Sequence, residues 1–569
     1  MKKINLRYFI LPVLAFCTAL ALNAQNRREP DEFHVHFNKT FYASGETAWF
    51  TIYFLNRDVE SAVVHAGLFD HTGNLLIDRK LPVMGNIASG SIDIPIEWQD
   101  GWYGFRVVTR WNLNFGSGAY YEKLLAVYNS SAPEPGTFRD PGRWTINPDT
   151  ISSEVNTTGL EISFDKKDYR PGDTIILSIQ AVDEDLSCRL SLSVLDLTQY
   201  AVISGISAGN IKPVTTQSRL LSTGYSPAFN TEKHPVLEGV IMKLDSPDLI
   251  SSNVISIYLA RSRDFVRTRA VRGKFSVELP GFQGEGIIQV LNLNPFQDQE
   301  PLIREVKIWE HLDGENQHLQ PPAHTREIDA YLYNLRLRMK LNEIFADKKE
   351  SAMIKEAVIR PLPPSDKHYD MTGFKDLKDL EEFVKVIMLT ANYALEGDHT
   401  SIRLQNEQKQ YYFMRHPWYF SDGLLSYQEG EFLSTPFTSI TTIDLYTTSE
   451  TLTRWDPLMI QSGIVALTTP NRYWENKFLA KKNVIRYEGF STGPEFVNSQ
   501  PELQAGLEPG PDLRPVVYWA PSVAFRQGEK TIVKFVTTDN PGIFRIEVEG
   551  ISSDGEIIRG MAFYKTRVR

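Results

Sequence analysis

Among the residues that could do chemistry, Ser207 stands in the most suggestive pattern. It is the serine of Gly205-Ile206-Ser207-Ala208-Gly209, which fits the G-x-S-x-G pattern of a nucleophile elbow. That chemistry needs the serine on a strand-to-helix turn, followed downstream by an acid and then a histidine. Residues 210–213, Asn-Ile-Lys-Pro, begin no helix. We therefore expect a Gly/Ser loop, and a serine hydrolase centred on Ser207 remains an alternative.

His34 and His36 are candidates for metal binding. Residues two apart on a strand share one face, so the two imidazoles could begin a metal site. A third ligand is not evident, and the chain has no CxxC pair, HExxH motif or Gly-rich phosphate loop. We interpret both as edge-strand histidines, and His234, His324 and His368 likewise. The sequence therefore predicts no catalytic residue, no cofactor and no metal.

The densest aromatic cluster is Trp418, Tyr419 and Phe420, beside His416 and Pro417. Exposed aromatic residues favour interfaces, but an aromatic run in a β-rich protein belongs more often to the core. We therefore expect these rings to be buried and do not assign them to a site.

The elements that position these residues must form several domains. The chain has 569 residues, whereas single cores stop growing at about 250–300 residues. Its first residues resemble a secretory signal, with three basic residues, an apolar run over 10–22 and a small residue, Ala24, for cleavage. We expect residues 1–24 to be removed from an exported protein, with a transmembrane anchor as the alternative. Lipid attachment at Cys17 is not expected, because a bulky phenylalanine precedes it.

Charge and cysteine content limit the possible binding partners and the possible disulfides. Without the three basic residues of the signal, the 60 basic and 70 acidic residues leave a formal charge of −13. This acidic balance argues against nucleic acid as a partner. Cleavage would leave Cys188 as the single cysteine, so no disulfide can form within one chain and the domains must be stable by core burial.

Strand patterns organise the first half of the chain. Short runs rich in β-branched and aromatic residues fill residues 25–130, as at 48–55 and 103–108, and are typical of a β-sandwich. A proline-rich linker follows at 131–153. A second strand-rich domain at 154–232 begins with a copy of an earlier pattern.

The copied pattern is an aromatic residue, a turn closed by glycine, an acid and a threonine. It occurs in Phe41-Tyr-Ala-Ser-Gly-Glu-Thr47 and again in Asp168-Tyr-Arg-Pro-Gly-Asp-Thr174. An internal repeat of this kind indicates two copies of one β-module. Gly45 and Gly172 are expected at turn positions with positive φ.

The second half mixes strands and helices. Residues 233–310 predict a third β-domain, and 311–360 a helical linker with apolar residues at helical spacing over 327–345. Residues 361–475 predict an α+β domain with a second helix near 377–387. The last segment, 476–569, again predicts strands with turns, as an immunoglobulin-like unit.

The second domain is short of strands, which suggests an unusual topology. Only residues 160–164, 174–179 and 189–195 form good strands there, whereas such a sandwich has about seven. The segment 515–569 offers further strands with open edges. We hypothesise that the two segments pair into one split sandwich, with residues 189–195 against 544–549.

These motifs resemble known modules. The run His36-Phe-Asn-Lys-Thr-Phe-Tyr-Ala-Ser-Gly-Glu-Thr-Ala-Trp-Phe50 looks like the opening of a macroglobulin-type (MG2-like) domain, and Tyr169-Arg-Pro-Gly-Asp173 resembles the next such domain. Residues 237–275 are similar to a carboxypeptidase-regulatory-like sandwich. The runs at 420–424, 440–444 and 463–468 resemble, in order, the plug domain of TonB-dependent receptors.

The resemblance implies a mostly β, multi-domain protein with tandem macroglobulin- or immunoglobulin-like sandwiches and a small α+β plug-like domain. It also implies the periplasm or outer membrane of a Gram-negative bacterium. About one hundred residues follow Thr468, too few for a transport barrel. The single mature cysteine, in Leu186-Ser-Cys-Arg189, lies in no thioester motif, so covalent protease capture is not expected.

The function that follows is a non-enzymatic one. We hypothesise a cell-envelope protein that binds or scaffolds other envelope or outer-membrane proteins, with the sandwiches as spacers, the plug-like domain as the docking module and no integral membrane span. The first alternative is an endopeptidase inhibitor of macroglobulin type without a thioester, for which residues 131–152 are the one plausible bait segment. The second alternative is the hydrolase centred on Ser207.

Overall fold

A computed structural model gives the fold of most of the chain after residue 28. The described residues are 29–56, 59–116, 118–131, 159–181, 188–200, 211–212, 227–242, 253–292, 302–312, 320–345, 362–396, 399–426, 429–470, 473–481, 483–491, 496, 498, 512–525 and 529–567. The expected signal segment and, apart from Ser131, the expected linker lie outside them. The chain divides into unit 1 (Met1–Lys233, Ile308–Lys349, Ser491–Arg569) and unit 2 (His234–Lys307, Glu350–Phe490).

The first sandwich of unit 1 consists of two sheets that share one core. One sheet has the order β1-β3-β6, and the other has β12-β8-β7-β4-β5 with β2 parallel to β8. The elements are β1 (Phe33–Phe37), β2 (Phe41–Ala43), β3 (Thr47–Phe54), β4 (Val63–Phe69), β5 (Leu75–Pro82), β6 (Ile87–Asp93), β7 (Gly101–Val108), the 3-10 helix η1 (Arg110–Phe115), β8 (Tyr121–Tyr128) and β12 (Ile211–Lys212).

Alternation along β3 explains how this sandwich forms. Ala48, Phe50 and Ile52 are buried in the core between the sheets. Trp49 and Thr51 therefore project from the opposite face, because successive side chains of a strand point to opposite sides. The outer face of β3 is thus available to contact a second domain.

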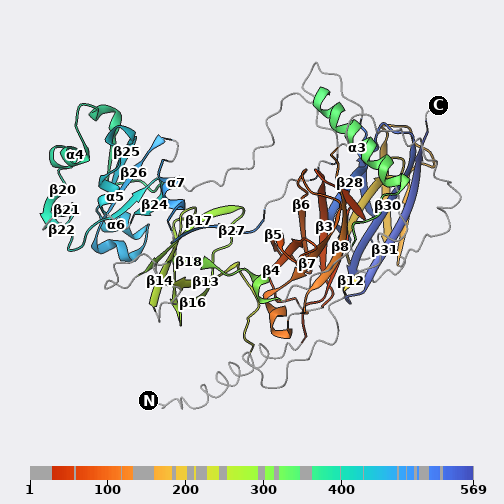
Figure 1. The fold of residues 1–569 in the computed structure, drawn as a ribbon, viewed down its shortest axis with the longest axis horizontal. Helices are drawn as coiled ribbons and strands as arrows, with labels where there is room; N and C mark the ends of the chain where they lie inside the picture. Colours follow the sequence, from red (N-terminus) through yellow and green to blue (C-terminus); the bar gives the residue numbers. More distant parts are fainter. Residues whose placement is uncertain are drawn as a thin grey trace, which may run out of the picture. The chain divides into compact units, whose positions relative to one another are not determined.

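The second sandwich of unit 1 is built from two distant parts of the chain. Its sheets have the orders β29-β10-β9 and β28-β11-β30-β31. The strands are β9 (Leu160–Phe164), β10 (Thr174–Ala181), β11 (Cys188–Asp196), β28 (Val516–Phe525), β29 (Thr531–Val536), β30 (Gly542–Ser552) and β31 (Ile557–Thr566). Strands from residues 160–196 and blue strands from the end of the sequence lie together in Figure 1.

The pairing hypothesised from sequence is present in this split sandwich. β11 runs antiparallel to β30, with Leu192 opposite Val548, and its other edge pairs with β28. β10 likewise lies between β9 and β29. The C-terminal strands therefore satisfy backbone groups that β10 and β11 would otherwise leave unpaired.

The repeated turn has the same backbone form in both sandwiches. Gly45 and Gly172 have φ values of +86° and +78°, a region that favours glycine because it has no Cβ. The acid after each glycine accepts a hydrogen bond from the backbone N–H three residues earlier, at 2.8 Å for Glu46 and 2.9 Å for Asp173. The predicted positive φ is confirmed at both positions.

Side chains outside the turn repeat as well. The hydroxyls of Tyr42 and Tyr169 donate to the Oδ1 atoms of Asn38 and Asp165, at 2.7 and 2.6 Å. Each of these Oδ1 atoms also accepts from a backbone N–H eleven residues later, at 3.1 Å in both cases. The internal repeat seen in the sequence therefore corresponds to one structural motif used twice.

Helix α3 (Arg326–Phe345) follows the 3-10 helix η2 (Ile308–His311) and packs on unit 1. Ile328, Leu332 and Leu335 join a core cluster with residues of β2, β8 and β11. Lys39 donates to Glu46 Oε2 at 2.6 Å and to the hydroxyl of Tyr331 at 2.9 Å. The segment expected as a helical linker is thus part of a core, because its apolar stripe faces the strands.

Unit 2 contains a third sandwich, with sheets β16-β13-β18 and β15-β14-β17-β27 around one core. Its strands are β13 (Val236–Met242), β14 (Asn253–Leu259), β15 (Asp264–Ala270), β16 (Lys274–Glu278), β17 (Glu285–Asn292), β18 (Leu302–Glu305) and β27 (Val484–Glu488). The expected domain ended at residue 310, but β27 comes from beyond the α+β part and pairs with β17.

The α+β part of unit 2 has a sheet of order β19-β25-β26-β23-β24 and a smaller sheet β20-β21-β22. Its strands are β19 (Lys367–Asp370), β20 (Ala391–Glu396), β21 (His399–Asn406), β22 (Tyr411–Tyr412), β23 (Trp418–Ser421), β24 (Leu424–Ser426), β25 (Thr442–Tyr446) and β26 (Ile464–Thr468). Its helices are η3 (Met371–Phe374), α4 (Leu380–Val386), α5 (Glu429–Leu433), η4 (Phe437–Ser439), α6 (Ser449–Thr453), η5 (Pro457–Gln461) and α7 (Tyr473–Leu479).

The described chain is therefore mostly β and multi-domain, as the sequence predicts. The helices expected at 327–345 and 377–387 correspond to α3 and α4. Within the described residues, no helix combines the length and the apolar character needed to cross a membrane.

Candidate functional site

His34 and His36 lie on β1, at the edge of its sheet as expected, but their side chains are buried. His34 Nε2 lies 2.7 Å from Glu549 Oε2, and His36 Nδ1 lies 2.5 Å from Ser191 Oγ. Both partners belong to the split sandwich. The described part of the chain holds no group of three or more histidine, cysteine or acidic residues that could bind a metal ion.

Burial and the contacts between these residues together set the charge state of this histidine cluster. Burial lowers the pKa of His36 to about 4. Burial alone would raise the pKa of Glu549, but the nearby charge of His36 and the hydrogen bond with His34 lower it to about 2. A neutral His36 and an ionised Glu549 are thus favoured, and the cluster joins the two sandwiches.

The other histidines flagged in the sequence have separate surroundings. His324 contacts Asp329 and Asp100 at 2.9 and 2.8 Å, and His368 contacts Asp444 at 2.8 Å. Burial lowers the pKa of His324, but its hydrogen bonds with the two aspartates outweigh burial and raise the pKa above its ordinary value. The residue proposed as a nucleophile, Ser207, lies outside the described residues.

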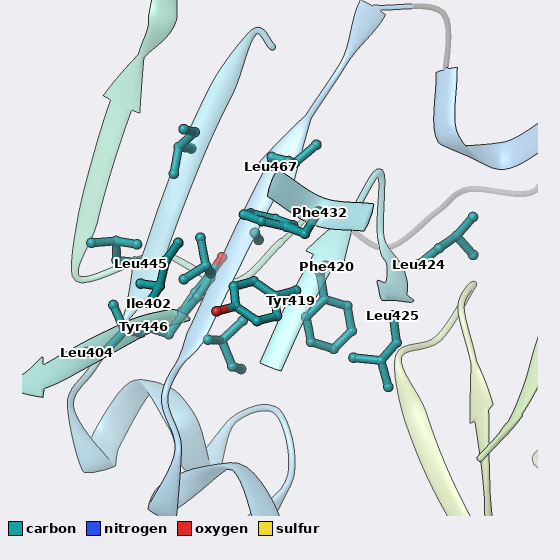
Figure 2. Packing of buried hydrophobic residues seen from close by; sticks show 14 of the residues in the cluster. Ile402, Leu404, Tyr419, Phe420, Leu424, Leu425, Phe432, Leu445, Tyr446 and Leu467 are labelled. Atoms are coloured by element: carbon teal, nitrogen blue, oxygen red, sulfur yellow. The ribbon is translucent and has the colours of Figure 1, made fainter. Parts of the chain in front are cut away.

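The aromatic cluster belongs to the core, as expected. Tyr419 and Phe420 of β23 are buried, and Trp418 is partly buried. Figure 2 shows Tyr419 and Phe420 among the leucines of the same core, with Phe432 of α5 beside them. These rings help to hold the α+β part together.

A neighbouring segment that the sequence interpretation passed over is exposed instead. Phe413 is buried with Leu404 of β21, whereas Tyr412 is 48 % and Met414 is 90 % exposed. Tyr411 is 45 % exposed. Residues 411–414 are all aromatic or apolar, so no alternation in the sequence distinguished the buried Phe413 from its exposed neighbours.

An apolar side chain is also exposed on the other side of β21. The backbone N–H of Gln405 donates to Thr390 O at 2.8 Å, so the chain just before β20 lies beside β21. Leu389, adjacent to Thr390, is 83 % exposed. Large apolar side chains therefore lie exposed on both sides of β21.

The backbone around β22 has an open hydrogen-bonding edge. A tight turn returns the chain from β21, with Gln410 at a φ of +52° and its N–H donating to Asn406 O. Phe413 N–H donates to Leu404 O at 2.9 Å. Because peptide groups alternate in direction along a strand, those of Tyr412 point away from β21, and Met414 lies just beyond the end of β22. Within the described chain, no strand pairs with that side of β22.

We call residues 411–414 the β22 edge. Within the described chain, it combines a strand side that has no partner strand with two exposed aromatic side chains and an exposed methionine. Such an edge is a template for an added strand from another chain.

Comparison with known proteins adds no family assignment. No family model matches the chain, and no curated protein matches it. Among solved structures, Salmonella alpha-2-macroglobulin reacted with methylamine aligns over 95 % of the chain at 10 % identity and a TM-score of 0.25. Escherichia coli alpha-2-macroglobulin activated by porcine elastase aligns over 95 % at 11 % identity and a TM-score of 0.25.

The chain spans 40 % of the Salmonella protein and 44 % of the Escherichia coli protein. TM-scores of this size do not define a shared overall fold. The sandwiches described above therefore rest on their own strand pairings and shared cores.

Proposed function

We propose that this chain is a non-enzymatic, exported cell-envelope protein that docks another envelope protein by strand addition at the β22 edge. The observation that carries the proposal is the open side of β22 at Tyr412, next to the exposed side chains of Tyr411, Tyr412 and Met414. Backbone hydrogen bonds would supply affinity, and the side chains would supply specificity. The sandwiches act as spacers that present this edge.

The sequence supports the cellular location and the kind of partner in this proposal. The signal-like segment 1–24 favours export, and the motifs at 420–424, 440–444 and 463–468 resemble plug domains of outer-membrane receptors. The α+β part that carries these motifs also carries the β22 edge. An outer-membrane protein with an exposed extended segment is therefore the proposed partner.

A photo-crosslinking amino acid at position 414, in whole envelopes, tests the proposal. We expect a discrete crosslinked product that disappears when Tyr412→Pro is added. Proline removes the outward N–H of residue 412 while leaving the Phe413 bond to β21 in place. Leu76→Pro is the matched control, because Leu76 is an exposed apolar residue of the edge strand β5 in unit 1 and is the bulge that the pairing with β4 skips.

Two results would contradict docking at this edge. One is a crosslinked product that persists at full yield in the Tyr412→Pro protein. The other is the absence of any product from position 414 when the same label elsewhere on the chain gives one. Melting curves of the parent and Tyr412→Pro proteins must agree, so that a lost product reports the edge and not unfolding.

The two alternatives remain sequence-level hypotheses. The bait segment required for an endopeptidase inhibitor, 131–152, lies outside the described residues apart from Ser131. Ser207 lies outside them as well.

A further inference from the structure

Unit 1 contains a pocket of about 360 Å³ where the first sandwich meets the split sandwich. The outer face of β3 and β6 forms one wall, and β28 forms another. Its volume falls at the lower end of the usual range of about 300–1,000 Å³ for small-molecule sites. The lining residues are Trp49, Arg79, Leu81, Ser89, Gly90, Ser91, Ser491, Phe496, Asn498, Trp519 and Pro521.

Aromatic rings from three separate segments line this pocket. Trp49 projects from β3 on the side away from the core, Trp519 comes from β28, and Phe496 comes from the chain that precedes it. The rings of Trp49 and Phe496 meet edge to face, with centroids 5.5 Å apart. The pocket therefore has flat apolar walls in a defined arrangement.

Hydrogen bonds hold the third wall in place. The Ser491 hydroxyl accepts from Lys80 N at 3.0 Å, and Ser491 N donates to Lys80 O at 2.8 Å. Asn498 Oδ1 accepts from Trp519 N at 3.0 Å. Ser491 and Asn498 are thus hydrogen-bonded to β5 and β28.

Polar groups share the same lining. Ser89 contributes a hydroxyl, and the bond from Trp519 to Asn498 Oδ1 leaves the Asn498 Nδ2 group to donate. Arg79 adds a guanidinium, whose Nε donates to Ser91 O at 3.3 Å. A purely apolar ligand would strip water from these groups without replacing their hydrogen bonds, which is costly.

We propose that this pocket binds one or two sugar rings of a carbohydrate. A pyranose ring has an apolar C–H face that stacks on aromatic rings and a rim of hydroxyls that both donate and accept hydrogen bonds. Trp49 and Phe496 match the face, and Ser89 and Asn498 match the rim. Trp519, which is only 1 % exposed, forms the floor behind them. The guanidinium of Arg79 extends the same recognition to a carboxylated sugar.

Tryptophan fluorescence and calorimetric titration of the mature chain test this site. The probes are glucose, N-acetylglucosamine, galacturonate, cellobiose and chitobiose at millimolar concentration, with a tripeptide as the comparison ligand. We expect at least one saccharide to bind saturably. Trp49→Ala, which removes a stacking wall, and Ser89→Trp, which fills the pocket, should each weaken binding at least tenfold.

Trp98→Ala is the matched control, because Trp98 stacks on Tyr103 at 4.5 Å and does not line the pocket. Binding to it should equal that of the parent. If Trp49→Ala fails to fold, the saccharide affinity of Ser89→Trp tests the proposal. The proposal is overturned if no saccharide binds, if the tripeptide alone binds, or if affinity for the saccharide is unchanged in Ser89→Trp.

Discussion

In the split sandwich, one buried leucine of β11 packs against strands from the end of the chain, so replacing it should destabilise the whole sandwich. Leu192 is fully buried in the core that also contains Val548 and Phe544 of β30. Replacing a buried leucine by alanine costs about 2–5 kcal/mol, depending on how far the cavity collapses. We expect about 3 kcal/mol for Leu192→Ala, because strands on both sides of β11 limit that collapse.

The same geometry predicts energetic coupling across the chain. Leu192 and Val548 are direct antiparallel partners and share one core. Val548→Ala removes two carbon atoms, worth about 0.8 kcal/mol each before any cavity cost. Neighbouring side chains of this kind couple by about 0.5–3 kcal/mol. The double variant should therefore differ from the sum of the single variants by at least about 0.5 kcal/mol.

The assay is hydrogen exchange under increasing urea, measured on peptides that cover β11 and β30. Protection of both strands should fall together in either single variant, since they belong to one sheet. Ile532→Ala is the control, because this side chain is 57 % exposed on β29 and should change stability by less than about 0.5 kcal/mol. Additive effects of Leu192→Ala and Val548→Ala, or unchanged β30 protection in Leu192→Ala, would refute the split sandwich.

Three further outcomes are expected. Gly45→Val and Gly172→Val should both lower the melting temperature, because both glycines have positive φ. The loss should be larger for Gly45→Val, because a Cβ at Gly45 would lie 2.8 Å from a side chain, whereas a Cβ at Gly172 would meet no atom within 4 Å. If both variants melt like the parent protein, the turn assignment is contradicted. Because the folded-state pKa values of His36 and Glu549 lie at about 4 and about 2, below their ordinary 6.5 and 4.5, unfolded chains bind more protons in acid. The free energy of unfolding should fall as pH drops from about 6.5 towards 4, where unfolded chains protonate His36, and this fall should be smaller in His36→Gln. It should fall further towards pH 2, where unfolded chains protonate Glu549. A melting temperature that does not change with pH would argue against both pKa shifts. Burial raises the pKa of the Cys188 thiol to about 12, so iodoacetamide at about pH 8 should label the protein only after unfolding, and rapid labelling of folded protein would disprove this.

Local pattern was enough to identify the fold class, two of the helices, a set of core strands and the repeated motif. Strand-like runs at 160–164 and 189–195 predicted β9 and β11 to within one residue, and the run at 544–549 predicted the central part of β30. The glycine turn was predictable because positive φ and the acid that closes the turn depend on residues within a few positions. The shortage of strands in the second domain also pointed to a partner elsewhere in the chain.

Long-range pairing decided what local pattern could not. His34 and His36 have an ordinary strand pattern, and their burial follows from Glu549 and Ser191, which lie far away in sequence. The addition of β27 to the third sandwich depends equally on a pairing across an intervening part of the chain. The pocket arises where β3, β6 and β28 meet, so no single segment encodes it. Strand alternation fixes which face of a strand is apolar, but which partner covers that face depends on the free energy of the assembled sheets.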